Sequence, residues 1–210
     1  MPTSPPLSKL SRYWDKQSPK YDRKMAFADR KFFGDTRQWI CDQASGEVLE
    51  VAIGTGLNMH LYPVEVTLTG MDLSPDMLAL ARKRAARLGF AVDLTVGDAE
   101  HLDFADASFD TVVCTFGLCA VPDEAKAIAE MVRVLRPGGL LLLGDHVVST
   151  SAPIRAVQAL IEVFSVRLGN ENFRRRPIRQ VREAGLTIER HSRFKKGMVE
   201  RLAARKPESP

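Results

Sequence analysis

Short apolar runs alternate with amphipathic segments along most of this chain. The runs are brief, rich in β-branched residues or leucine, and typical of buried parallel strands. The predicted strands of this kind are 47–52, 68–72, 91–96, 109–115 and 140–144. The intervening segments with apolar residues at helical spacing are 75–88, 123–135, 153–168 and 178–184. Strands that alternate with helices predict a doubly wound α/β domain.

The last two predicted strands differ from the others because no helix separates them. Residues 186–193 and 198–204 alternate between apolar and polar positions, as paired outer strands do. The four residues between them are too few for a parallel crossover, so this pair must be antiparallel. The complete prediction is a seven-stranded sheet that is mostly parallel and contains one reversed strand.

The first 44 residues carry helical patterns and no strand. We expect a helix within 7–16 and a second helical region over 19–44, which Gly34 interrupts. Residues 1–6 are rich in proline, and we expect them to be disordered.

Composition places the chain among ordinary globular domains, with 45% hydrophobic and 27% charged residues. It has no apolar run near the ~18 residues of a membrane span, and its first residues lack the pattern of a secretory signal. Its three cysteines are odd in number and lack paired metal-like spacing. We therefore expect a cytoplasmic protein with free thiols and no metal.

The net charge of +4 is concentrated towards the C-terminus, where arginines and lysines crowd residues 174–182 and 190–206. One interpretation is a solvated basic face. The other is attraction to an anionic membrane surface or to nucleic acid. Nucleic acid is the less favoured partner, because aromatic residues do not interleave with this basic stretch.

The segment Val48–Asn58 is the most informative part of the chain. An apolar strand runs directly into Gly54 and Gly56, which allow a sharp turn and close approach of a ligand. Glu50 lies inside the apolar run, where a carboxylate is costly unless a group donates to it. The combination describes a nucleotide-type ligand at the carboxyl end of a strand. Met59 stands where a dinucleotide site has its third glycine, and no lysine follows Gly56 as in a phosphate-binding P-loop.

Two further acids follow the next predicted strands. Asp72 ends the second strand and can accept hydrogen bonds from both hydroxyls of a ribose. Its alternative role is a helix N-cap, but Ser74 can serve as that cap. Asp98 follows the third strand and can accept from the amino group of an adenine, or it can simply stabilise a turn.

These motifs, taken in order, resemble those of class I S-adenosylmethionine-dependent methyltransferases. The resemblance rests on Glu50 with Gly54 and Gly56, Asp72, Gly97-Asp98-Ala99, the strand 109–115, and residues 133–139, and it spans about residues 45–150. It is strongest for the branch that includes the quinone-biosynthesis C-methyltransferases. One departure is Ala52, because the family usually has glycine at that position.

The resemblance implies a Rossmann-like fold, S-adenosyl-L-methionine as methyl donor and S-adenosyl-L-homocysteine as product. It implies that Glu50 orients the amino-acid end of the donor, that Asp72 binds the ribose, and that Asp98 binds the adenine. The residues it assigns to the donor are Glu50, Ala52, Gly54, Gly56, Asn58, Asp72, Leu73, Met77, Asp98, Ala99 and Thr115. The implied organisation is an N-terminal helical lid (1–44), the donor-binding domain (45–206) and a short tail (207–210).

Two narrower likenesses concern the methyl acceptor. Residues 113–121, 133–139 and 145–147 resemble alkyl-thiol methyltransferases, whereas 48–63 resembles bacterial phospholipid N-methyltransferases. We therefore expect a small, apolar or amphiphilic acceptor. The alternatives are a phospholipid N-methyltransferase at the membrane periphery and a protein that binds the donor without catalysis.

Methyl transfer requires mainly alignment, because the methyl group of a sulfonium is already activated. A base is needed only if the acceptor must lose a proton. His146, just past the fifth predicted strand, is the candidate base, although it can equally be a structural histidine. Tyr21 is the second candidate catalytic residue, above the methyl donor, with a core aromatic residue as its alternative.

Overall fold

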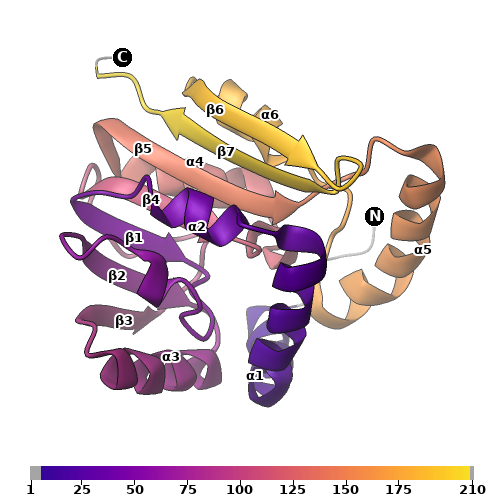
Figure 1. The fold of residues 1–210 in the computed structure, drawn as a ribbon, viewed down its shortest axis with the longest axis horizontal. Helices are drawn as coiled ribbons and strands as arrows, with labels where there is room; N and C mark the ends of the chain where they lie inside the picture. The colour runs from indigo at the N-terminus through magenta and orange to yellow at the C-terminus, as the bar shows by residue number, and fades with distance from the viewer. Residues whose placement is uncertain (1–5, 209–210) are drawn as a thin grey trace.

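The structure, a computed structural model, describes residues 6–208. A seven-stranded sheet with the order β3-β2-β1-β4-β5-β7-β6 forms its centre (Figure 1). The strands are β1 (Glu47–Val51), β2 (Thr67–Asp72), β3 (Val92–Val96), β4 (Phe109–Thr115), β5 (Leu135–His146), β6 (Thr187–Phe194) and β7 (Val199–Arg205). The helices are α1 (Leu7–Ala28), α2 (Thr36–Cys41), α3 (Pro75–Leu88), α4 (Glu124–Val134), α5 (Ala152–Gly169) and α6 (Pro177–Glu183).

The sheet confirms the predicted topology. Strands β3, β2, β1, β4 and β5 pair in parallel, and β7 runs antiparallel to both of its neighbours. The carboxyl ends of the parallel strands therefore meet at one edge, where an α/β sheet binds its ligands.

Alternate residues of the central strands supply two separate cores. Leu49, Val112 and Leu141 belong to the core on the face covered by α4 and α6. Their neighbours Val48 and Val113 belong to the core under α2 and α3. This alternation of side chains along each strand accounts for the continuous apolar runs in the sequence, since both faces of the sheet are buried.

The N-terminal helix corrects the prediction of a helix within 7–16 and a separate region from residue 19. Helix α1 runs without a break from Leu7 to Ala28, with Pro19 inside it. A proline at 19 cannot donate to the carbonyl of Asp15, but the Ser18 hydroxyl donates to that oxygen at 2.9 Å. The chain turns sharply only at Gly34, after a single π-helical turn, Asp29–Phe33.

The start of β5 is the second correction. The helix before it was expected to end at the Pro137-Gly138-Gly139 turn, but β5 already begins at Leu135. The pairing of β4 with β5 shifts from Phe109–Leu135 to Thr111–Leu140, so residues 136–139 form a bulge in β5. Gly138 accommodates this bulge with a φ of 75°.

Several charged side chains of the basic C-terminal stretch are engaged in ion pairs. Arg176 and Arg193 approach the buried Glu200 at 3.3 Å, and Arg201 pairs with Asp35 at 2.6 Å. These arginines therefore help to hold the sheet edge together. Lys195 and Lys196, at the tip of the β6–β7 hairpin, are exposed.

Among residues 6–208, no helix is both long enough and apolar enough to cross a membrane. The prediction of disorder for residues 1–6 falls almost wholly on residues outside the described range, as does the end of the 207–210 tail.

Candidate functional site

A pocket opens at the carboxyl ends of β1, β2, β3 and β4, and α1 closes one side of it. The space between its walls is about 660 Å³, which includes open solvent at its mouth. The lining residues are Leu7, Leu10, Trp14, Tyr21, Ala52, Gly54, Met71, Asp72, Leu73, Met77, Gly97, Asp98, Ala99, Phe116, Gly117, Ala120, Val121 and Pro122.

Asp72 joins the glycine turn to the start of α3. Its carboxylate accepts from the Gly54 amide at 2.8 Å and from the Ser74 amide at 2.9 Å. Burial raises its pKa to about 6, against the lowering effect of these two bonds. The N-cap of α3 is Ser74, whose hydroxyl accepts from the Met77 amide. Asp72 is therefore not the cap, and its oxygens retain lone pairs that face the pocket wall.

Asp98 stabilises a turn, as one of its two interpretations predicted, and its place at the pocket leaves the adenine interpretation a prediction. It lines the pocket, and it also stabilises a turn by accepting from the Glu100 amide at 3.0 Å. Its other oxygen lies 3.3 Å from Nδ1 of His101. A turn of this kind fixes the position of the carboxylate before any ligand arrives.

Glu50 lies behind the glycine turn, outside the pocket lining. Its two oxygens accept from Asn58 at 2.7 Å and from the Tyr62 hydroxyl at 2.9 Å. Burial raises its pKa to about 7, and these bonds moderate the shift. Only two of the three predicted acids, Asp72 and Asp98, therefore line the pocket, because the buried carboxylate of Glu50 is engaged by Asn58 and Tyr62.

Arg37 completes this buried network, although no motif in the sequence pointed to it. Its Nη1 donates to Asn58 at 3.0 Å and to Thr115 at 3.1 Å, while Nε pairs with Asp29 at 3.1 Å. Neither Asn58 nor Thr115 lines the pocket. Nη2 of Arg37 is buried and has no hydrogen-bond partner among the described residues. No local signal in the sequence marks Arg37, because Asn58 and Thr115 are far away in the chain.

The glycine turn contains a strained alanine. Ala52 has a φ of 57°, a left-handed conformation that costs an alanine about 1 kcal/mol relative to glycine. Its methyl group faces Gly117, where an added Cβ would lie 2.7 Å away. Gly54 has a φ of 59°, and its open side faces the Tyr21 ring. Gly56 lies outside the pocket lining, against Met59.

The remaining predicted residues divide between the pocket and its surroundings. Tyr21, Leu73, Met77 and Ala99 line the pocket. Tyr21 comes from α1, and burial raises its pKa. Phe116, which was not predicted, also has a left-handed backbone (φ 55°), a strained conformation for an aromatic residue. It stacks on Phe33 with ring centroids 3.8 Å apart, which joins the π-helical turn after α1 to the end of β4.

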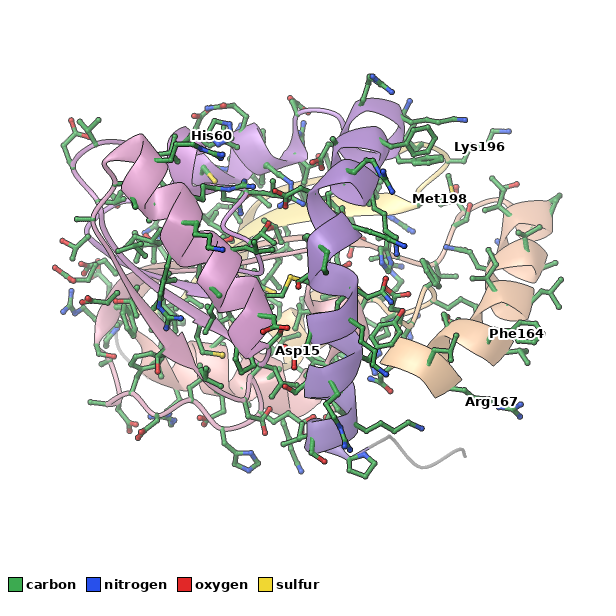
Figure 2. The ribbon with its side chains drawn as sticks, turned by 90° about the horizontal axis from the view of Figure 1, so that it is seen from below. Asp15, His60, Phe164, Arg167, Lys196 and Met198 are labelled. Carbon is green, nitrogen blue, oxygen red and sulfur yellow. The ribbon has the colours of Figure 1, made fainter. Side chains whose placement is uncertain are left out.

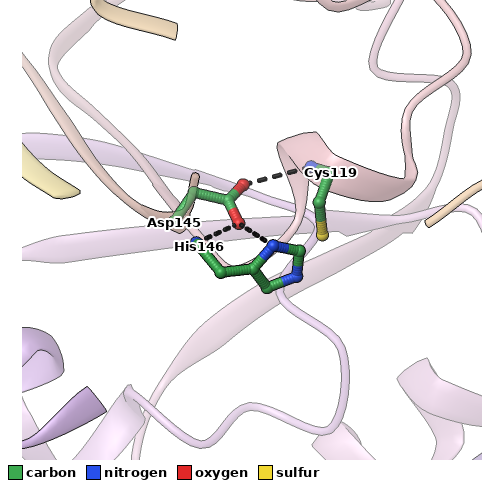
Figure 3. A group of neighbouring side chains, drawn as sticks. All are labelled: Cys119, Asp145 and His146. Atoms are coloured by element: carbon green, nitrogen blue, oxygen red, sulfur yellow. Dashed lines mark hydrogen bonds and ion pairs between the residues drawn. The ribbon is translucent and has the colours of Figure 1, made fainter. Parts of the chain in front are cut away.

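His146 belongs to a separate cluster at the end of β5 and is not part of the pocket lining. Its ring stacks on Phe173, and Nδ1 lies 3.8 Å from a carboxylate oxygen of Asp145 (Figure 3). Asp145 also accepts from the amides of His146 and Cys119. Ligand atoms of Cys119, Asp145 and His146 lie within 4.8 Å of one another, close enough to share a cation.

The family comparison identifies the central part of the chain. The model described as "Methyltransferase domain" matches residues 49–143, which run from β1 to the middle of β5 and include most of the pocket. The match to this methyltransferase domain covers a little under half of the chain, 95 of its 210 residues. This domain contains the glycine turn, Asp72 and Asp98, the features on which the resemblance was based.

Relatives of the domain act on different acceptors, as their names state. The chain is 40% identical to a phosphatidylethanolamine N-methyltransferase of Cereibacter sphaeroides, over 59% of this chain and 62% of that protein. It is 35% identical to a demethylmenaquinone methyltransferase of Renibacterium salmoninarum, over 70% and 63%. It is 36% identical to a thiol S-methyltransferase of Homo sapiens, over 62% and 54%. The matches thus span less than two thirds of these relatives.

A solved structure extends the likeness to the whole fold. The crystal structure of the [4+2]-cyclase SpnF matches with a TM-score of 0.77, covering 99% of this chain and 98% of that one at 18% identity. At this identity the match concerns architecture alone, and it confirms the Rossmann-like α/β fold.

The methyl donor of the family is S-adenosyl-L-methionine, and the residues of the methyltransferase domain fit it. The pocket offers carboxylates for polar groups, apolar walls for a flat ring, and a glycine turn without a side chain on its open face. Arg37 lies outside this domain and outside the pocket lining, but its guanidinium stacks on the lining residue Phe116 and has a buried Nη2 with no partner among the described residues. The site therefore contains complementary groups for an adenosyl moiety and for an amino-acid end.

Proposed function

We propose that the chain is an S-adenosylmethionine-dependent methyltransferase that acts on a small, apolar or amphiphilic acceptor. The observation that carries the proposal is the shared pocket of Asp72 and Asp98 beside the Gly54 turn. Leu7, Leu10 and Trp14 make much of the opposite wall apolar. An acceptor held against such a wall would be selected by shape and apolar area.

In this proposal Asp72 accepts from the ribose hydroxyls and Asp98 accepts from the adenine amino group. Leu73 and Met77 flank the ring. The bound donor supplies an activated methyl group, so the chain has to align the acceptor and exclude water. Tyr21, in α1 above Gly54, is suited to closing this space, and Trp14 packs edge-on against it, with ring centroids 6.4 Å apart.

We assign the carboxylate end of the donor to Arg37. Its Nη2 is the one guanidinium nitrogen with no partner in the Asn58–Thr115 network. A carboxylate at this point would satisfy a buried donor that is otherwise costly. Glu50 then acts indirectly, by holding Asn58 in place.

The test is calorimetric titration with S-adenosylhomocysteine. Wild type should bind in the micromolar range, and Asp72→Asn should weaken binding at least about tenfold through loss of a charge-assisted hydrogen bond. Asp93→Asn, an exposed acid of β3 outside the pocket lining, is the matched control and should bind like wild type. Equal affinities for all three proteins would remove Asp72 from the site.

The variant Arg37→Met tests whether Arg37 binds the amino-acid end of the ligand or affects the binding of its adenosyl end as well. It should weaken S-adenosylhomocysteine more than 5′-methylthioadenosine, which has no amino-acid end. A proportional loss for both ligands would contradict the assignment of Arg37 to the carboxylate.

A screen for the acceptor would follow S-adenosylhomocysteine formation with alkyl thiols, amines, phenols and phospholipids. His146→Gln should slow only those acceptors that lose a proton, if His146 is the base. The second candidate function is phospholipid N-methylation, which the 40% identical relative favours. Turnover of phosphatidylethanolamine but not of thiols would select it. Donor binding without any turnover would favour a non-catalytic protein.

A further inference from the structure

Helix α5 (Ala152–Gly169) presents its polar side to the protein and its apolar side to solvent. Gln158, the buried polar residue of this helix, accepts from the Ser149 amide at 2.9 Å and donates to the carbonyls of Val147 and Phe173. Ser165 donates to the Glu171 carbonyl at 2.7 Å. The helix is thus anchored to loop backbones through polar contacts, the reverse of ordinary amphipathic packing.

The outward side of α5 is a continuous apolar surface. We call it the α5 face: Val157, Leu160, Ile161, Phe164 and Leu168, each between 45% and 66% exposed. The spacing of these residues places them on one side of a helix. Five adjacent large apolar side chains form a patch of the kind that marks an interaction site, since isolated exposed residues need no such explanation.

Positive charge borders the α5 face. Arg167 is exposed in the last turn of α5, and the exposed Lys195 and Lys196 lie next to its first turn, where the Thr150 amide donates to the Lys196 carbonyl. Figure 2 shows Phe164, Arg167 and Lys196 on the same side of the molecule. The single acid of α5, Glu162, is paired with Arg174.

We propose that the α5 face docks on the surface of an anionic lipid bilayer. The helix would lie in the plane of the interface with its apolar side chains in the boundary between headgroups and acyl chains. Arg167, Lys195 and Lys196 would contact lipid phosphates. Its ~27 Å length, at ~1.5 Å per residue, suits an interfacial helix.

Charge is the reason to prefer lipid over a second copy of the chain. In a two-fold dimer with antiparallel α5 helices, the lysines near one end of the helix would approach Arg167 of the copy, and with parallel helices Arg167 would approach Arg167. Like charges placed opposite one another disfavour such an interface.

Docking would also bring the methyltransferase pocket towards the bilayer. Helix α5 packs against α1, where the Tyr13 ring fills the space beside Gly169. Helix α1 in turn supplies Leu10 and Trp14 to the pocket. The inference does not require that the acceptor itself be a lipid.

The experiment is flotation of the full chain with vesicles of phosphatidylglycerol and phosphatidylcholine, and with phosphatidylcholine alone. Wild type should float with the anionic vesicles and detach as salt rises towards about 0.5 M. Val157→Ser with Leu160→Ser should reduce binding at least about tenfold. Val64→Ser with Leu88→Ser makes the same chemical change at exposed positions outside α5 and should bind like wild type.

A second measurement does not depend on weakening the helix. Phe164→Trp should gain fluorescence that shifts to the blue with anionic vesicles and is quenched by brominated acyl chains. The native Trp14 and Trp39 of wild type provide the background signal.

The proposal is overturned if wild type fails to float, or if the α5 pair of substitutions binds as well as the control pair. It is equally overturned if sedimentation shows a dimer that the α5 pair dissociates, because a second copy then covers the face. Donor binding measured on the same proteins should be unchanged, which separates this result from failure of the proposed enzymatic function.

Discussion

Helices α3 and α5 both have an apolar side, but α3 turns it towards the protein and α5 turns it towards solvent. Helix α3 buries Met77, Leu78 and Ala81 against the sheet, while Asp76 and Arg82 face solvent. Helix α5, at the edge of the molecule in Figure 1, buries Gln158 and exposes Leu160 and Phe164. Apart from Leu88 at its end, α3 therefore buries its apolar side within the chain, whereas the apolar side of α5 has no partner among residues 6–208. The half of the molecule around α3 contains the pocket that we propose for the donor, and we call it the donor half.

The largest expected difference between the two helices is in how much one leucine of each contributes to the free energy of unfolding. Leu78→Ala should lower the free energy of unfolding by about 3 kcal/mol, because it leaves a cavity in the core under α3. Leu160→Ala should change it by less than about 0.5 kcal/mol, because Leu160 is 66% exposed. Urea denaturation of both variants measures the contrast. A comparable loss in Leu160→Ala would mean that α5 is packed against something in solution.

Adding a side chain in the glycine turn should weaken ligand binding as well as strain the backbone. Gly54→Ala and Gly89→Ala place alanine at similar φ values, 59° and 62°, so each should cost about 1 kcal/mol of stability. Only Gly54 lines the pocket, and an added Cβ at Gly89 has no neighbour within 4 Å. Calorimetry should show at least about a tenfold loss of S-adenosylhomocysteine affinity in Gly54→Ala alone. Equal affinities would place the ligand elsewhere.

Because of Glu50, the free energy of unfolding of the chain should depend on pH. Its pKa rises from 4.5 to about 7 on folding, so the folded chain holds the proton more tightly between these values. This contribution to stability is complete below pH 4.5 and is lost as the pH rises through 7.

Relative to Glu50→Gln, wild type should therefore lose about 1–3 kcal/mol of stability between pH 5 and pH 8. Urea titrations of both proteins across this range are the measurement. Parallel curves would show that burial does not perturb Glu50.

The smallest predicted effect concerns Ala52. Ala52→Gly relieves a left-handed alanine and should raise stability by up to about 1 kcal/mol. Ala107→Gly, at a φ of 51° and away from the pocket, should gain a similar amount. Thermal unfolding compares the two variants. Destabilisation in Ala52→Gly alone would mean that its methyl contact with Gly117 outweighs the strain.

The sequence predicted the donor half well because its signals are local. The turn at Gly54, the Ser74 cap and strand β4 depend on neighbouring residues, and the structure has β4 at the predicted residues 109–115. The continuity of α1 depends on Ser18 replacing the hydrogen bond that Pro19 cannot make, which a pattern rule does not include.

Features set by distant contacts were not predictable in this way. Arg37 donates to Thr115, which lies 78 positions further along the chain, and no local sequence pattern predicts that contact. The helix at 153–168 was predicted, but its orientation follows from the loop carbonyls that Gln158 meets. An apolar stripe predicts a helix without telling whether the stripe faces the core or a partner outside the chain.

Hydrogen exchange with S-adenosylhomocysteine tests the central claim most directly. We predict that the ligand slows exchange in the β1 turn around Gly54, at the β2 end around Asp72 and in the 97–99 loop, and leaves α5 unchanged. Unchanged exchange at these three segments, or protection confined to α5, would contradict the account.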